Sequence, residues 1–177
     1  MNKVLTDYVI TIDNFLTDSE CTRYIDLIDS TRNAKKFTTA SDFKNAVYID
    51  QVTSDLLYHR LKQFISANDQ LNIITNNNLI AFGCYQPGQE FGIHTDTGLY
   101  YNNEKQLATT YTLLIYLNDN FNGGLTTFYD SALTEICSII PKRGRALLFD
   151  IDLAHKGNKV QDNSKYWIGI EIIGRLT

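Results

Sequence analysis

The first apolar pattern along the chain has the spacing of a helix. Four apolar residues lie three or four positions apart and would share one face of a helix over residues 18–30: Cys21, Tyr24, Ile25 and Ile28. Just before it, Thr17 and Glu20 have the spacing of a capping box, in which each side chain satisfies the other residue's free backbone N–H. The pattern therefore predicts a capped helix.

A second helix is predicted over residues 53–66. Its apolar residues again fall on one face: Leu57, Leu61, Phe64 and Ile65. His59 lies off that face, so we expect it at the surface as an ordinary helix residue.

From Leu79 onward the pattern changes to short apolar, β-branched and aromatic runs separated by Gly, Asn and Asp. These runs predict strands over residues 79–86, 91–95, 108–117, 125–129, 135–140, 145–150 and 165–173. Pro87 and Pro141 fall between the strands, where a missing N–H is tolerated. Two helices followed by many short strands favour a mainly β sandwich, jelly roll or barrel with helices on one side.

Length and composition indicate one domain. The 177 residues suffice for a single core, which we divide into helical support over about 1–75 and a β core over about 79–175. The hydrophobic share of 44% is typical of folded proteins, which argues against wholesale disorder. A net charge of −4 and scattered basic residues argue against a nucleic-acid binder. The small basic group around Gly144 is interpreted as a turn between strands.

The sequence also suggests where the protein works. Its longest apolar run, Leu113 to Leu117, is far shorter than a membrane span, and the first residues lack the apolar block of a secretory signal. The three cysteines are widely spaced and odd in number, so neither a disulfide framework nor a cysteine zinc site is indicated. We therefore expect a cytoplasmic protein with no membrane partner.

The first candidate for chemistry is the sequence His94-Thr95-Asp96. On an extended strand, residues two apart point to the same face, so an imidazole and a carboxylate converge there. His155 is the only other histidine of the β-rich part of the sequence. Two histidines and one carboxylate form the facial triad of non-haem Fe(II) oxygenases. Alone, however, the pair is more typical of a polar strand end than of a metal site.

The surrounding motifs strengthen the metal-site interpretation. They occur in this order: Tyr85 to Asp96, Tyr111 to Asp119, Phe121 to Phe128, Pro141 to Asp150, and His155-Lys156-Gly157 followed by Lys165-Tyr166. Over about residues 79–175 the chain resembles the 2-oxoglutarate- and Fe(II)-dependent dioxygenases of the prolyl 4-hydroxylase type. The resemblance implies a double-stranded β-helix (jelly roll) that uses Fe(II), 2-oxoglutarate and O₂.

The resemblance also implies roles for single residues. His94, Asp96 and His155 would bind the iron, and Lys165 would pair with the distal carboxylate of 2-oxoglutarate. Tyr85 matches a tyrosine that hydrogen-bonds this cosubstrate. A buried dicarboxylate needs a cation at its far end, which agrees with the role of the lysine.

Strand parity extends the predicted pocket. Thr112 and Tyr116 share the face that lines the cosubstrate pocket in relatives, and Thr126 matches a threonine there, although such residues also serve as packing. By the same parity, Trp167 and Gly169 would shape the substrate side of the cavity, if Lys165 faces the metal.

One departure concerns the strand that carries Lys165. Some relatives have a second long cation farther along it, whereas this chain has Gly169 and Glu171 on that face, so no relative's substrate can be assumed. Residues 97–106, after the first two ligands, could form a lid or a plain surface loop.

The resemblance implies hydroxylation of an unactivated C–H bond with release of succinate and CO₂. The substrate could be a prolyl residue, an amino acid or another small molecule, so a small-molecule or short-peptide partner is expected and nucleic acid is not. The oligomeric state is open. Two alternatives remain: a nucleic-acid dealkylating dioxygenase, and a metal-binding jelly-roll module without turnover.

Overall fold

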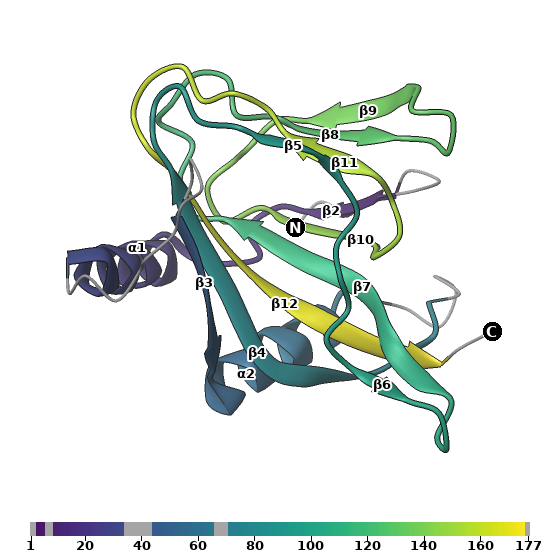
Figure 1. The fold of residues 1–177 in the computed structure, drawn as a ribbon. Helices are drawn as coiled ribbons and strands as arrows, with labels where there is room; N and C mark the ends of the chain where they lie inside the picture. Colours follow the sequence, from purple (N-terminus) through teal and green to yellow (C-terminus); the bar gives the residue numbers. More distant parts are fainter. Residues whose placement is uncertain (1–2, 6–8, 34–43, 66–70, 176–177) are drawn as a thin grey trace.

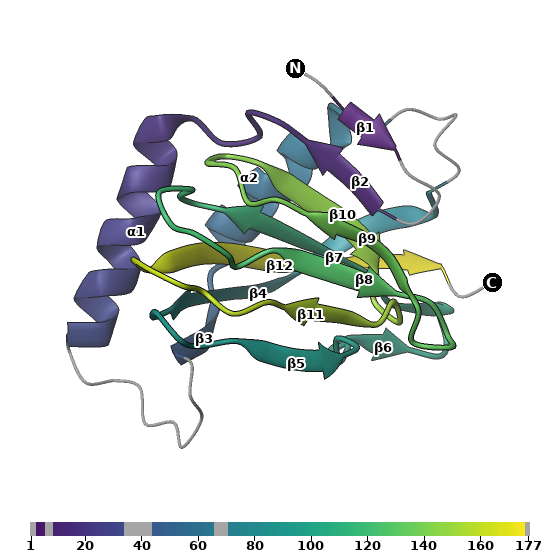
Figure 2. The ribbon, with the colours of Figure 1, turned by 90° about the horizontal axis from the view of Figure 1, so that it is seen from above.

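Two antiparallel β-sheets face each other, and two helices support the larger one (Figure 1). The computed structural model describes residues 3–5, 9–33, 44–65 and 71–175. The helices are α1 (Asp18–Asn33) and α2 (Gln51–Lys62). Figure 2 shows the smaller sheet in front of the larger sheet, with α2 behind.

The larger sheet has the strand order β1-β2-β10-β7-β12-β4-β3, and β6 pairs with β7. Its strands are β1 (Lys3–Leu5), β2 (Val9–Ile12), β3 (Lys44–Ile49), β4 (Ile73–Tyr85), β6 (Tyr101–Asn102), β7 (Leu107–Tyr116), β10 (Ala146–Asp150) and β12 (Lys165–Arg175). The smaller sheet has the order β5-β11-β8-β9. Its strands are β5 (Phe91–His94), β8 (Thr126–Tyr129), β9 (Glu135–Ile139) and β11 (His155–Gly157).

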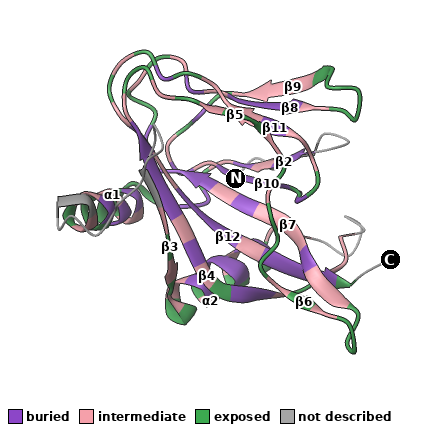
Figure 3. Ribbon diagram, viewed as in Figure 1, coloured by how far each residue is buried: buried purple, intermediate pink, exposed green. Residues whose placement is uncertain are grey.

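The mainly β, jelly-roll fold class is therefore confirmed. Alternation along β7 and β12 separates two environments. Leu113, Ile115, Ile168 and Ile170 belong to the core that includes residues of both helices, and they are buried. The alternate residues face the smaller sheet, where a second core contains Tyr116, Phe128 and Phe149. Figure 3 shows buried and half-buried positions along both strands.

Both predicted helices and the capping box are confirmed. The Thr17 N–H donates to Glu20 Oε2 at 2.8 Å, and the Glu20 N–H donates to Thr17 Oγ1 at 3.3 Å. Glu20 also accepts from Arg60 of α2, whose Nη2 lies 2.7 Å from Oε1, so the cap ties the two helices together. Chiefly the hydrogen bond from Arg60, opposed by burial, lowers the pKa of Glu20 to about 2.

The N-terminal part is not purely helical, which corrects the predicted helical support. Three strands lie within the first 50 residues, and all three belong to the larger sheet: β1 pairs with β2, β2 pairs with β10, and β3 pairs with β4. They are three, four and six residues long, so a short apolar run there could not be assigned by periodicity. Strand β4 also begins at Ile73, six residues earlier than predicted.

The basic group around Gly144 forms the predicted turn. Gly144 has a φ of 74°, and a side chain there would collide with the backbone of Leu16. Arg145 Nε donates to Asp13 Oδ1 at 2.6 Å, and Lys142 Nζ lies 3.2 Å from Asp13 Oδ2. These basic residues therefore fasten the β9–β10 turn to the N-terminal segment. In the described part of the chain, no helix has the length and apolarity needed to cross a membrane.

Candidate active site

The smaller sheet brings His94 and His155 together, and Asp96 follows β5 of the same sheet. His94 ends β5 and His155 begins β11, and the two residues are directly paired in the smaller sheet. His94 Nε2 lies 3.5 Å from Asp96 Oδ1, and His155 Nε2 lies 3.7 Å from the same oxygen. One ligand atom from each of the three residues lies within 4.8 Å of the others. This spacing places three ligand atoms around one point.

Neighbouring backbone groups orient both imidazoles. Nδ1 of His94 lies 2.9 Å from the Gly92 carbonyl oxygen, and Nδ1 of His155 lies 3.0 Å from that of Leu153. A carbonyl oxygen only accepts, so each Nδ1 carries a proton, and in the neutral imidazole the lone pair then lies on Nε2. Burial lowers the pKa of His155, which also favours the neutral, ligating form. Both rings thus present nitrogen lone pairs toward Asp96.

Thr112 of β7 orients the carboxylate. Its hydroxyl donates to Asp96 Oδ2 at 2.6 Å, which leaves Oδ1 near the two Nε2 atoms. Burial raises the pKa of Asp96, but hydrogen bonds and the nearby histidines outweigh burial and bring it below its ordinary value. The carboxylate is therefore ionised at neutral pH. Two imidazoles and one carboxylate on one side of a shared point fit Fe(II) with open positions.

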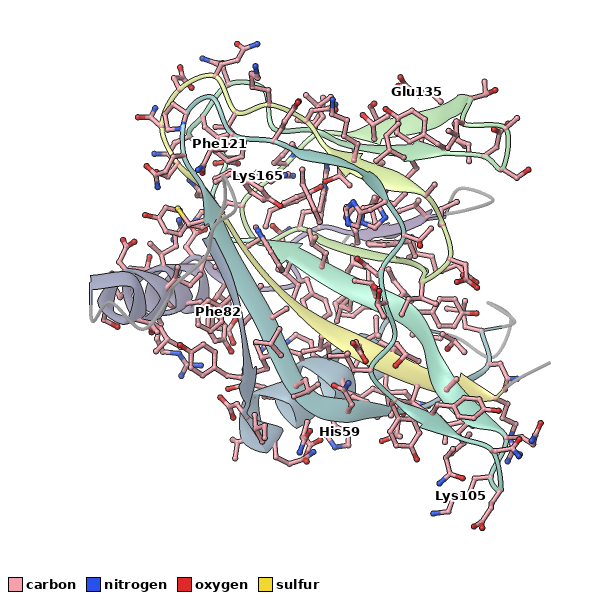
Figure 4. All side chains as sticks on the ribbon, viewed as in Figure 1. His59, Phe82, Lys105, Phe121, Glu135 and Lys165 are labelled. Atoms are coloured by element: carbon pink, nitrogen blue, oxygen red, sulfur yellow. The ribbon has the colours of Figure 1, made fainter. Side chains whose placement is uncertain are left out.

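A cavity of about 330 Å³ adjoins the three ligands. Lys165 lines it and is only 3% exposed, while its Nζ donates to the Gly124 carbonyl oxygen at 2.6 Å. Figure 4 shows Lys165 in the space between the sheets, whereas His59 lies outside on α2, as predicted. Burial lowers the pKa of Lys165 to about 7, because its charge is removed from water. No carboxylate among the described residues pairs with this lysine.

The family model of the 2OG-Fe(II) oxygenase superfamily matches residues 80–170, which is just over half of the chain. The chain belongs to this superfamily. It is accordingly a 2-oxoglutarate-dependent dioxygenase that uses Fe(II), 2-oxoglutarate and O₂. The residues at the candidate site fit this cofactor, because two imidazoles and one carboxylate are a ligand set typical of Fe(II) oxygenases.

Solved structures support the oxygenase fold. A viral collagen prolyl hydroxylase from Paramecium Bursaria Chlorella virus-1, in complex with 2OG, has a TM-score of 0.65 and 20% identity, covering 96% of this chain and 97% of that one. A Pseudomonas putida prolyl-4-hydroxylase has a TM-score of 0.63 and 14% identity, covering 96% of this chain and 93% of that one. A Trichoplax adhaerens prolyl hydroxylase, in complex with a hypoxia inducible factor peptide, has a TM-score of 0.63 and 19% identity, covering 96% of this chain and 84% of that one. No curated protein sequence matches the chain.

The expected cosubstrate residues of the oxygenase gather near Lys165. Tyr85 is paired with Lys165 in the sheet and lines the cavity, and burial raises the pKa of its phenol. Thr126 also lines the cavity and accepts a 2.6 Å hydrogen bond from the Tyr116 hydroxyl. Tyr116 itself is fully buried, and its ring centroid lies 5.0 Å from Lys165 Nζ. Tyr116 therefore supports the lysine and Thr126 from behind the cavity wall.

Thr112 contacts a group other than the expected one. It lines the cavity, but its hydroxyl is bonded to Asp96 rather than directed to a cosubstrate contact. Strand parity placed Thr112 on the correct face, yet parity does not show which polar group on that face it reaches.

Trp167 and Gly169 both line the cavity, as predicted. The Trp167 indole lies over Gly83, and a Cβ added at Gly83 would be only 2.7 Å from the indole Nε1.

Sequence reasoning missed the aromatic packing around the ligands. The His94 ring centroid lies 3.8 Å from that of Phe91, and the His155 centroid lies 4.9 Å from that of Phe149 and 5.8 Å from that of Phe128. Phe128 and Phe149 belong to different sheets, so no local sequence pattern pairs them with His155. Their rings restrict the imidazole and exclude water from its buried side.

We predict that Thr112→Val weakens iron binding by about 10- to 100-fold, the usual effect of losing a residue that orients a metal ligand. Valine keeps the shape of the side chain but cannot donate to Asp96 Oδ2. Titration of the apoprotein with Fe(II) under anaerobic conditions checks this. Thr127→Val is the matched control, because the Thr127 hydroxyl contacts Ser138 instead of a ligand. Equal iron affinity in Thr112→Val and the wild type would contradict the orienting role.

Proposed function

We propose that this oxygenase hydroxylates an unactivated C–H bond of a compact substrate, a small molecule or a short peptide segment, and converts 2-oxoglutarate to succinate and CO₂. One observation supports it above the others: the three ligand residues line a cavity, and so does a buried lysine that pairs with no carboxylate of the described residues. In this proposal the whole chain acts as one oxygenase domain, since β2 and β3 complete the larger sheet.

We assign the cofactor residues as follows. His94, Asp96 and His155 hold Fe(II), and three open positions remain for 2-oxoglutarate and O₂. Lys165 pairs with the distal carboxylate of 2-oxoglutarate, and the Tyr85 phenol donates to the same cosubstrate. When bound, Fe(II) and 2-oxoglutarate supply the oxidising chemistry that removes hydrogen from carbon and returns hydroxyl.

The protein contributes positioning and exclusion of water. Apolar side chains line much of the cavity, including Leu79, Leu114, Ile151 and Trp167. Such a lining strengthens the pairing of Lys165 with a carboxylate, because the interaction occurs away from water. It also leaves room beside the ligand residues for a substrate carbon.

The fold neighbours carry the names of prolyl hydroxylases, which supports a prolyl residue as one candidate substrate. Nucleic-acid dealkylation is less well supported, since a net charge of −4 does not attract phosphates. A metal-binding module without turnover would not need both an intact ligand set and a buried lysine.

The test is a substrate screen with anaerobically reconstituted enzyme, Fe(II) and 2-oxoglutarate. Peptidyl proline, free amino acids and other small metabolites are added with O₂, and succinate is quantified beside product mass. The proposal expects succinate formation coupled to a gain of one oxygen atom in one substrate. Absence of 2-oxoglutarate consumption, with and without substrates, would overturn it.

We predict that Gly169→Arg abolishes hydroxylation of the substrate but retains substrate-independent decarboxylation of 2-oxoglutarate. An arginine at Gly169 would extend from the cavity wall beside Trp167 into the substrate volume. A Cβ there lies 3.1 Å from the Leu113 carbonyl oxygen, so Gly169→Ala is the control for local strain. Undiminished hydroxylation in Gly169→Arg would show that this position does not border the substrate.

A further inference from the structure

Glu171 is a cavity residue to which the oxygenase chemistry described above gives no role. It lies on β12 with Lys165, Trp167 and Gly169, and all four line the cavity. Glu171 lies six positions after Lys165, which corresponds to about 20 Å along an extended strand. The strand therefore presents a cation at one position of the cavity and a carboxylate at another.

The carboxylate lies beside the ligand residues. Glu171 is directly paired with Thr112 in the β7–β12 ladder, and Thr112 donates to the Asp96 carboxylate. A substrate group at Glu171 would thus be close to the proposed iron, on the side away from Lys165. This is where a substrate must lie if 2-oxoglutarate occupies the lysine side.

Neutral donors hold Glu171 in place. Its Oε2 accepts from Asn77 Nδ2 at 2.6 Å, from Thr109 Oγ1 at 2.8 Å and from the Leu99 N–H at 3.1 Å. Oε1 has one longer contact, 3.3 Å from the same Leu99 N–H. The side chain is therefore oriented mainly through Oε2, and Oε1 retains most of its capacity to accept.

No cation among the described residues balances the charge of the Glu171 carboxylate. Among the described residues, no lysine, arginine or histidine forms an ion pair with Glu171. Burial, and to a smaller extent the charge of Asp96, raises the pKa of Glu171. The hydrogen bonds to the carboxylate lower this pKa but do not cancel the effect of burial. The hydrogen bonds from neutral donors offset part of the cost of burying this carboxylate, and a bound partner with positive charge would offset more of it.

Much of the wall around this side of the cavity is apolar. Asp96, Thr97 and Thr112 also line the cavity as polar residues, and its apolar lining includes Leu79, Ala81, Leu99, Leu114 and Trp167. In such surroundings an ammonium or guanidinium group gains a charge-assisted hydrogen bond, whereas a neutral group gains much less. Binding pockets of this kind select ligands through a few polar groups.

We propose that Glu171 is a specificity-determining residue that binds a cationic nitrogen, an ammonium or guanidinium group, of the oxygenase's substrate. This inference rests on the proposed function, because it assumes that the cavity beside the ligand residues receives the substrate. The cationic nitrogen lies a few bonds from the hydroxylated carbon. It belongs either to a free amine or amino acid, or to a basic side chain of a peptide.

Trp167 provides a direct measure of binding. It is the single tryptophan of the chain and lines the same cavity, so its fluorescence reports occupancy without turnover. The probes are n-butylammonium and n-butylguanidinium, compared with neutral n-butanol and n-butylurea, on enzyme loaded with Fe(II) and 2-oxoglutarate without O₂. Two further pairs distinguish the source of the nitrogen: L-proline against N-acetyl-L-proline, and acetyl-Gly-Arg-Gly-amide against its citrulline analogue.

We expect saturable binding of the cationic probes and at least tenfold weaker binding in Glu171→Gln. Glutamine keeps the shape and can still accept from Asn77 and Thr109, so the change removes mainly charge. Glu104→Gln is the control for charge alone, because Glu104 is exposed on the β6–β7 turn. Thr109→Val removes one donor but keeps the charge, so it should retain the preference for cations.

Three outcomes would overturn the inference: no saturable binding of any cationic probe, equal binding of cationic and neutral probes, or equal loss of both in Glu171→Gln. The third outcome would make Glu171 a purely structural acceptor for Asn77, Leu99 and Thr109. Failure of the proposed function is separate, because it would appear as absent 2-oxoglutarate consumption in the wild type whatever the fluorescence shows.

Discussion

His155→Ala should abolish iron-dependent turnover and weaken Fe(II) binding by more than about 100-fold, beyond the range for residues that only orient a ligand. His155 supplies one of the three proposed ligand atoms, and its Nε2 lies 3.7 Å from Asp96 Oδ1. Removing it leaves one histidine and one carboxylate, which cannot form the facial triad. Anaerobic Fe(II) titration and succinate formation measure the two effects, and we expect one iron per wild-type chain.

Stability must be separated from metal binding in this experiment. His155 is buried between Phe128 and Phe149, so alanine there also leaves a cavity. His94→Ala is the second variant, since the His94 side chain is 22% exposed and its loss disturbs less packing. His59→Ala, at the surface of α2, is the matched control and should retain full activity. Normal iron-dependent turnover in folded His155→Ala would exclude this ligand set.

The sequence predicted the elements whose patterns are long and local. The helix that begins at Asp18 has a capping box and an apolar stripe, and both are present in the structure. Strands β2 and β3 were missed, because four to six residues without a clear alternation do not distinguish a strand from a loop. Their strand conformation depends on pairing with β10 and β4, which lie far away in the sequence.

The sequence indicated which candidate site residues share a cavity, but not all of their contacts. Parity along β12 placed Lys165, Trp167 and Gly169 on one face, and all three line the cavity. The bond from Thr112 to Asp96 could not be predicted, because it joins the two sheets and depends on how they pack. The hydrogen bonds of Glu171 likewise join β12 to β4, β7 and Leu99.

The sequence is compatible with either a lid or a surface loop over residues 97–106, and the structure shows a third arrangement. Tyr101 and Asn102 form strand β6, which pairs with the start of β7, and the Thr109 N–H donates to the Tyr100 carbonyl oxygen. Thr97 and Leu99 line the cavity on the way to this hairpin. The segment is thus fastened at β6 and contributes to the cavity wall before it.

Lys165→Met should raise the KM for 2-oxoglutarate by well over tenfold, because losing one partner of a buried charge pair costs about 2–5 kcal/mol. Methionine fills a similar volume, which limits the packing loss that Lys165→Ala would cause at a site 3% exposed. Iron affinity should change little. Steady-state succinate formation against 2-oxoglutarate concentration gives the measurement, and an unchanged KM would show that another cation holds the cosubstrate.

The same lysine should make 2-oxoglutarate binding depend on pH. Burial lowers the pKa of Lys165 to about 7 without ligand, and a bound carboxylate raises it again by stabilising the ammonium. The ligand therefore binds the protonated form better, so affinity is greatest below about pH 7 and falls as pH rises through that value. Binding of 2-oxobutyrate, which lacks the distal carboxylate, provides the control for titration of the iron ligands. The ratio of the two affinities should fall with pH in the wild type and stay constant in Lys165→Met; a constant ratio in both would contradict the pairing.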